Sequence, residues 1–221
     1  MELDFTVIAE HWRFLASGVG VTLALAALSG LTSIATGFAI ALARLYGPRW
    51  LRSIVVFYID SMRAIPVLVV LVWTFFALPI VGGITMAPFF AALLGLTVHL
   101  AAYAAEIFRA GIESVRPGQT RASLALGMSR AQIVRRIVLP QAVVRMLPAF
   151  GSLLSVTIKD TAIASVIAVP ELMRQSETVQ GQTFQPIEVY TFAMLIYFLM
   201  LFPVTRGVDL LYRRVAHLGR S

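Results

Sequence analysis

No charged residue occurs between Arg13 and Arg44, and this uninterrupted run constrains the fold more than any other feature of the chain. A helix rises about 1.5 Å per residue, and about 20 apolar residues suffice to cross the hydrocarbon core of a bilayer. The run over residues 14–43 exceeds that requirement. It therefore predicts a membrane-spanning helix that is tilted or extends beyond the bilayer.

Four further apolar segments predict four further spans, over residues 54–78, 88–108, 147–169 and 189–211. The composition agrees, because 59% of the residues are hydrophobic and only 13% are charged, whereas soluble domains are roughly 45–50% apolar and about 25% charged. We therefore expect residues 1–221 to form one all-α membrane domain of five spans. The length leaves no room for a separate soluble catalytic domain.

The basic residues indicate the orientation of the spans. The first and third connections are rich in arginine, whereas the second, over residues 79–88, contains no basic residue, and the fourth is mainly acidic. The positive-inside rule then places the N-terminus on the outer side of the membrane and the C-terminal bases, from Arg206 to Arg220, in the cytoplasm. Residues 109–146 become a cytoplasmic loop. The net charge of +7 is better explained by orientation and contacts with anionic membrane lipid than by nucleic acid binding.

Several classes of site are excluded by the residues that are missing. The chain has no cysteine, and its three histidines, His11, His99 and His217, lack the spacing of metal ligands. We expect these histidines to be surface or packing residues, and no metal site. Lys159 is the only lysine, and it does not lie in the glycine-rich motif of a P-loop. If ATP powers this protein, another chain must bind and hydrolyse it.

The segment over residues 121–140 has the pattern of two short helices separated by a bend. Residues 120–126 are good helix formers, Gly127 permits a bend, and Ser129 with Gln132 has the form of a capping box that starts a second helix. Pro140 and Pro148 are expected to mark the end of that helix and the return to the membrane. On periodicity alone, an amphipathic helix lying on the bilayer surface is an equally good interpretation.

The same segment resembles the EAA loop of ABC importer permeases. The usual loop has Glu-Ala-Ala, a glycine after three more residues, and Ile-x-Leu-Pro after nine more; here the positions hold Arg121-Ala122-Ser123, Gly127 and Ile137-Val138-Leu139-Pro140. The sequence departs from the pattern at Arg121 and Ser123. The resemblance is to permeases of the histidine, glutamine and arginine type, and it extends over roughly residues 15–212. The further matching stretches are RAIP (63–66), EIFRAGIESV (106–115), PGQ (117–119), LPQA (139–142) and KDT (159–161).

This resemblance implies a non-catalytic permease subunit of a type I, binding-protein-dependent ABC importer for polar amino acids or close derivatives such as opines. It implies a bacterial inner-membrane location and three kinds of protein partner: a cytoplasmic ATPase dimer that binds the ATP, a second permease subunit that is identical or paralogous, and a periplasmic solute-binding protein. The short helix would be the coupling helix that docks on the ATPase. The residues expected to make that contact are Arg121, Ala122, Ser123, Leu126, Gly127 and Met128.

Polar residues within the spans are candidates for a substrate pathway, because ionisable groups are costly at membrane depth. Arg63 is three residues after Asp60, and Glu106 is three residues before Arg109, so each pair can form at an interface. Lys159 and Asp160 lie deeper and point about 100° apart on a helix. A structural role in contacts between spans is one interpretation. The other is a pathway lined by Lys159 or Asp160 with two threonines, since an amino-acid zwitterion needs both charge signs. The candidate pathway residues are Arg63, Glu106, Thr157, Lys159, Asp160 and Thr161.

Two other classes of protein fit this sequence less well. A self-sufficient secondary carrier or channel for small polar solutes would need a coupling-ion site and normally more spans or an internal repeat. A membrane-embedded enzyme would need clustered nucleophile or acid–base residues. Neither pattern is found in the sequence.

Overall fold

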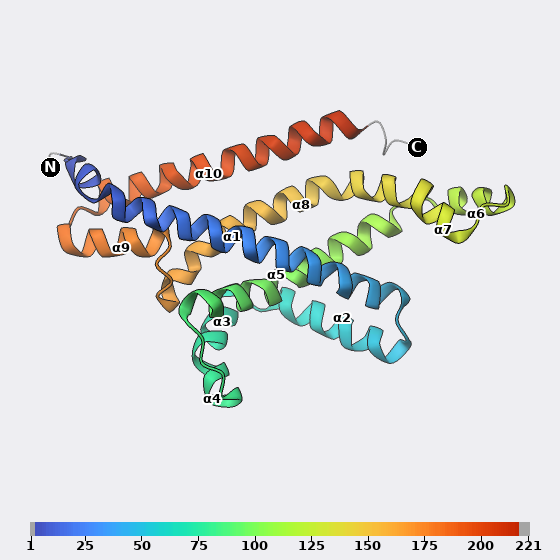
Figure 1. The fold of residues 1–221 in the computed structure, drawn as a ribbon, viewed down its shortest axis with the longest axis horizontal. Helices are drawn as coiled ribbons and strands as arrows, with labels where there is room; N and C mark the ends of the chain where they lie inside the picture. The colour runs from blue at the N-terminus through green and yellow to red at the C-terminus, as the bar shows by residue number, and fades with distance from the viewer. Residues whose placement is uncertain (1–2, 217–221) are drawn as a thin grey trace.

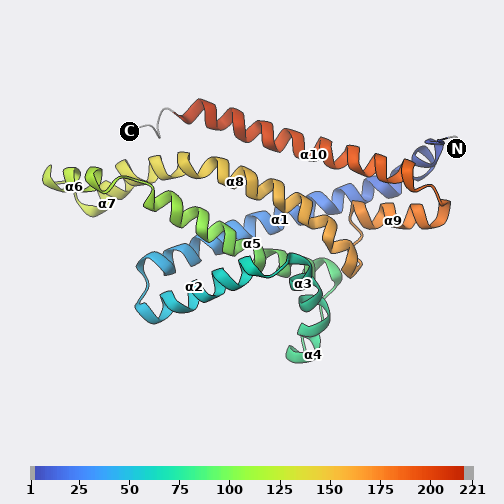
Figure 2. The same ribbon diagram turned by 180° about the vertical axis from the view of Figure 1, so that it is seen from behind.

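The computed structural model describes residues 3–216, and all regular structure in this range is helical (Figure 1). His217 and Arg220 lie outside the described residues. The long helices lie along one axis, with the N-terminus at one end of the bundle and the C-terminal end of the last helix towards the other (Figures 1 and 2). They are α1 (Thr6–Tyr46), α2 (Arg49–Ala64), α5 (Pro88–Glu113), α8 (Leu139–Thr161) and α10 (Pro186–Val215).

The predicted membrane class is confirmed by the length and hydropathy of these helices. Four segments are long and apolar enough to cross a bilayer: Thr6–Tyr46, Pro88–Glu113, Arg130–Ile167 and Pro186–Val215. A fifth span is reached when α2 is counted together with the helical segment that follows it, Val67–Gly82.

The predicted span over residues 54–78 is not one continuous helix. It is broken between α2 and α3 (Val67–Val72), and the two parts meet at 106°. The cause is Pro66, which lacks a backbone N–H and disfavours helical geometry at the preceding residue; Ile65 is extended, with φ −86° and ψ 131°. The chain then leaves the bundle sideways through α3 and α4 (Leu78–Gly82), as Figure 1 shows.

Two prolines that were expected near helix ends lie instead within continuous helical segments. The helix that starts with α7 (Arg130–Ile133) runs through Pro140 and Pro148 into α8, so the predicted end at Pro140 is wrong. A π-helical turn, Val134–Val138, immediately precedes α8, and the N–H of Leu139 donates to Val134 O, five residues back. This wider turn shifts the hydrogen-bond register just before the proline. The turn Trp73–Ala77 precedes Pro79 in the same way.

The contact between α1 and α5 is the most extensive in the bundle, and it is made by small side chains. A Cβ atom added at Gly37 of α1 would lie 2.5 Å from Ala104 Cβ and 2.8 Å from Ala101 O on α5. The main buried cluster continues from this contact through Leu25, Leu96 and neighbouring residues. Small residues allow helix backbones to approach closely, which is how helices associate where lipid is as apolar as the side chains.

A further amphipathic helix, α9 (Leu172–Thr183), lies at the N-terminal end of the bundle and was not predicted (Figure 1). It follows the 3₁₀ turn Ala162–Ile167. Glu171 caps it, fully buried, and accepts hydrogen bonds from the N–H groups of Met173 and Arg174 and from the hydroxyl of Tyr197 on α10. Burial raises the pKa of Glu171, and these donors oppose that rise. One carboxylate thus fastens α9 to the bundle.

The α1–α5 contact gives a prediction with a matched control on the same helix. Gly37→Leu should destabilise the protein by about 1–3 kcal/mol, the usual cost of overfilling a packed interior. Gly20→Leu should be nearly neutral, because nothing lies within 4 Å of a Cβ added at Gly20. Thermal unfolding in detergent checks both variants, and equal losses of stability would contradict the packing described here.

Candidate functional site

The short helix α6 (Pro117–Ala125) lies at the far end of the bundle, and its C-terminus is closed by a Schellman motif. Met128 N–H donates to Ser123 O at 3.1 Å, and Gly127 N–H donates to Leu124 O at 3.0 Å. This motif requires a left-handed residue after the helix, which favours glycine; Gly127 has φ +80°. The predicted bend at Gly127 is therefore confirmed.

The predicted capping box is also formed. Ser129 Oγ accepts from Gln132 N–H, and Gln132 Oε1 accepts from Ser129 N–H at 2.8 Å. Two caps in succession fix the angle between α6 and α7. The tip of the molecule is therefore a rigid turn between two helices.

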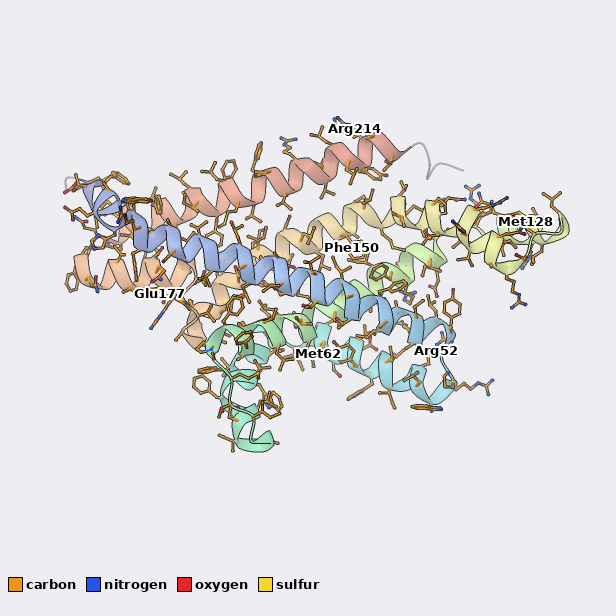
Figure 3. All side chains as sticks on the ribbon, viewed as in Figure 1. Arg52, Met62, Met128, Phe150, Glu177 and Arg214 are labelled. Atoms are coloured by element: carbon orange, nitrogen blue, oxygen red, sulfur yellow. The ribbon has the colours of Figure 1, made fainter. Side chains whose placement is uncertain are left out.

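This tip exposes an apolar side chain. Leu126 is 82% exposed, and Figure 3 shows Met128 at the extreme end of the molecule. Arg121 and Ala122 are also exposed, whereas Ser123 is buried and donates its hydroxyl to Gln119 O. Five of the six predicted coupling residues therefore have accessible surface, and Ser123 has an internal role instead.

A second candidate site is a cavity of about 540 Å³ between α2, α3, α5 and α8. Its polar wall consists of Arg63, His99, Glu106 and Asp160, together with Tyr103 and Ser152. Three of the predicted pathway residues, Arg63, Glu106 and Asp160, are thus brought together from three helices. We refer to this space as the charged cavity.

The carboxylates of the charged cavity differ in their partners. Glu106 is held by the guanidinium groups of Arg44 and Arg109, and Arg63 Nη1 lies 4.0 Å from Glu106 Oε2. Asp160 is half-buried and makes no hydrogen bond or salt bridge within the described range. It is therefore free to receive a cation.

Arg63 does not form the expected pair with Asp60, since no salt bridge between them occurs among the residues that the structure describes. It lies at the C-terminal end of α2, about 21 Å along the helix from Arg49 at 1.5 Å per residue. This end of α2 packs against α5, where Arg63 lies near Glu106 and Tyr103. The expected Glu106–Arg109 pair is formed, at 2.8 Å.

The other predicted pathway residues do not line the charged cavity. Lys159 faces a separate groove between α8 and α10, which it shares with Thr205 and Asp209. Thr157 and Thr161 are buried, and their hydroxyls donate to carbonyls of their own helix. The divergence of Lys159 and Asp160 follows from their adjacent positions on α8.

His99 was expected to be a surface or packing residue, and its place in the cavity wall was missed. It is only 5% exposed, and its Nδ1 has no hydrogen-bond partner among the described residues. Its ring lies 5.4 Å from that of Tyr103. The spacing of His99, Tyr103 and Glu106 at i, i+4 and i+7 on α5 was the available signal, since such positions share a helix face. Within residues 3–216 no cluster of His, Cys, Asp or Glu could hold a metal ion.

Comparisons with known proteins agree with this architecture. Residues 33–217 match the family of binding-protein-dependent transport system inner membrane components. The probable amino-acid ABC transporter permease protein YckA of Bacillus subtilis is 34% identical, with 94% of this chain and 92% of that protein covered. The nopaline transport system permease protein NocM of Agrobacterium fabrum is 34% identical, with 94% and 90% covered.

Among solved structures, the crystal structure of an amino acid ABC transporter with histidines superposes with a TM-score of 0.90 and 34% identity, covering 97% of this chain and all of that one. The family match covers most of the chain, and the fold agrees with it over almost the full length. This chain therefore belongs to the family of binding-protein-dependent transport system inner membrane components, the non-catalytic permease subunits of ABC transporters.

Proposed function

We propose that this chain imports polar amino acids, or derivatives such as opines, across the inner membrane as one half of a permease pair. The observation that carries the proposal is the charged cavity, in which an unpaired carboxylate, Asp160, and a loosely held guanidinium, Arg63, line one space. A zwitterion offers an ammonium group to the first and a carboxylate to the second. The relatives named above transport amino acids or nopaline, which share these two groups.

In this proposal, the energy of ATP hydrolysis on the partner subunit reaches the permease through α6. Membership of the family implies an ATPase and a solute-binding protein as partners. The exposed Leu126 and the rigid turn at Gly127 suit a helix that is seated in a cleft of the ATPase. A rigid element of this kind transmits closure of the ATPases as movement of the spans.

The proposed orientation puts α6 and the C-terminal end of α10 in the cytoplasm and α9 in the periplasm. Figure 3 supports it, because Arg52, Met128 and Arg214 lie towards one end of the molecule and Glu177 lies at the other. Arginine-rich ends lie preferentially on the cytoplasmic side. The solute-binding protein would then meet the end that carries α9.

A self-sufficient carrier or channel is the alternative, and it is tested by reconstitution. Proteoliposomes that contain the chain, its ATPase and its binding protein should accumulate labelled amino acid only when ATP is supplied. The probes are the standard L-amino acids and nopaline. Uptake by the chain alone, without ATP, would establish the alternative.

The coupling helix is tested by Leu126→Glu. A charge placed without a partner in a buried contact should lower ATP-driven uptake about tenfold or more, while membrane insertion stays normal. Leu126→Met is the control, because it keeps an apolar side chain of similar size. Normal uptake by Leu126→Glu would show that α6 does not dock on the ATPase.

The charged cavity is tested by Asp160→Asn and Arg63→Gln. Each should raise the half-saturating concentration of the best-transported amino acid about tenfold, because a hydrogen bond to a charged group contributes about 1.5–3 kcal/mol. Lys159→Gln is the matched control: it also removes a charge from α8 but faces the other groove. Unchanged half-saturation in both cavity variants, or an equal effect of Lys159→Gln, would place the substrate elsewhere.

A further inference from the structure

One carboxylate on α5 joins three helices through three arginines. Glu106 Oε1 accepts a hydrogen bond from Arg44 at the end of α1. Its Oε2 accepts from Arg109 Nη2 at 2.8 Å and Nε at 3.1 Å, and it lies 4.0 Å from Arg63 Nη1 at the end of α2. The side chain of Glu106 is only 17% exposed. We refer to Glu106 and its three arginines as the junction.

The junction lies between two hollow spaces. Glu106, Ile107 and Ala149 line the charged cavity, and the same three residues line a second hollow of about 310 Å³ that extends to Ser114 and Arg145. From Glu106 the helix α5 runs only seven residues further, to Glu113. Arg109 also pairs with Glu113, so a chain of ion pairs leads from the charged cavity to the start of the segment that carries α6.

Of the three arginines of the junction, Arg63 makes the weakest contact with Glu106. Its contact with Glu106 is at the limit of a salt bridge, its side chain is 45% exposed, and its guanidinium lies 5.7 Å from the centre of the Tyr103 ring. It is also three residues before Pro66, where the helix bends by 106°. Arg63 therefore connects Glu106 with the end of α2 that adjoins the bend.

The charges of the junction are unbalanced even when Glu113, the second partner of Arg109, is counted with it. Three guanidinium groups, of Arg44, Arg63 and Arg109, face two carboxylates, Glu106 and Glu113, which leaves an excess of one positive charge. The remaining carboxylate of the charged cavity, Asp160, forms no salt bridge with any of them within the described range. An anion that enters the cavity would therefore meet Arg63 as the least satisfied cation.

We propose that Glu106 is a positioning residue that competes with the carboxylate of the bound amino acid for Arg63. In the empty permease Glu106 holds Arg63 and with it the bend at Pro66. When substrate occupies the cavity, its carboxylate draws Arg63 away, and the released junction passes this change to α6 through Arg109 and Glu113. The inference rests on the proposed substrate site, but it assigns Glu106 to signalling and not to substrate binding.

The test measures ATP hydrolysis by the reconstituted permease, ATPase and binding protein with and without the best-transported amino acid. Glu106→Gln preserves the shape of the side chain and removes its charge. It should raise hydrolysis without substrate about 5-fold or more, towards the stimulated rate of the wild type, in keeping with typical coupling between sites. Added substrate should then stimulate little further. Asp60→Asn is the control, because Asp60 is an exposed carboxylate of α2 that forms no salt bridge among the described residues. It should keep both the low basal rate and the stimulation.

The variant Arg44→Gln distinguishes a signalling role of the junction from a purely structural one. It removes the contact with α1 but leaves Glu106 free to hold Arg63 more strongly. The substrate concentration for half-maximal stimulation should therefore rise several-fold, while basal hydrolysis stays low. If both variants lose hydrolysis alike, or if Glu106→Gln keeps normal basal hydrolysis and normal stimulation, the junction is only structural and the inference is overturned. A rise in half-saturation with intact stimulation in Glu106→Gln would overturn it too, because Glu106 would then be a substrate ligand.

A different result is expected if the charged cavity is not the substrate site. If Arg63→Gln and Asp160→Asn leave uptake unchanged while Glu106→Gln raises basal hydrolysis, the cavity is not the substrate site, and the competition for Arg63 is overturned with it. If those two variants weaken binding and Glu106→Gln has no effect on hydrolysis, the substrate site stands and only the signalling role fails. Expression level and size-exclusion profile confirm that each variant is folded.

Discussion

The close approach of α1 and α5 is the contact on which the other helices depend. It is possible because Gly37 meets alanines of α5 and because the buried hydroxyls of Ser29 and Ser33 are satisfied within α1 by the carbonyls of Leu25 and Gly30. These two hydroxyls therefore need no water. With α1 fixed on one side, α5 is left to contact α2, α3 and α8 on its other sides, and the charged cavity is the space that these helices leave between them.

The ionisable groups within the spans fall into two classes. Glu106 and Arg109 satisfy each other and their neighbours, as expected for charges that must be paired to be tolerated in a low-dielectric interior. Asp160 and His99 Nδ1 have no such partners among the described residues. Buried polar groups are nearly always bonded in native proteins, so the buried His99 Nδ1, which lines the same cavity as the half-buried Asp160, agrees with the proposed substrate site.

Features that depend on nearby residues could be predicted from the sequence. The capping box at Ser129, the turn at Gly127 and the apolar spans each follow from a short stretch of chain, and the spacing from Ala122 to Pro140 indicated the family. Features that depend on how helices meet could not. The helix continues through the π turn before Pro140, and α2 begins at Arg49, so that Arg63 lies at its far end and lines the charged cavity. The helix α9 was not predicted because its packing depends on a long-range hydrogen bond, from the hydroxyl of Tyr197 on α10 to the carboxylate of Glu171.

The π turn at Val134–Val138 also sets the rotation of α8 about its own axis. The helix α7, which follows the tip, and the cavity wall on α8 belong to one continuous helical segment, from Arg130 to Ile167, and each residue of an α-helix turns the next by about 100°. The one extra residue in the π turn therefore decides which face of α8 is directed at the charged cavity. Without it, the side of α8 that carries Asp160 would be turned away by about the angle that now separates Asp160 from Lys159. Insertions or deletions between Ser129 and Asp160 are thus constrained by angle as well as by length, even where both ends remain folded.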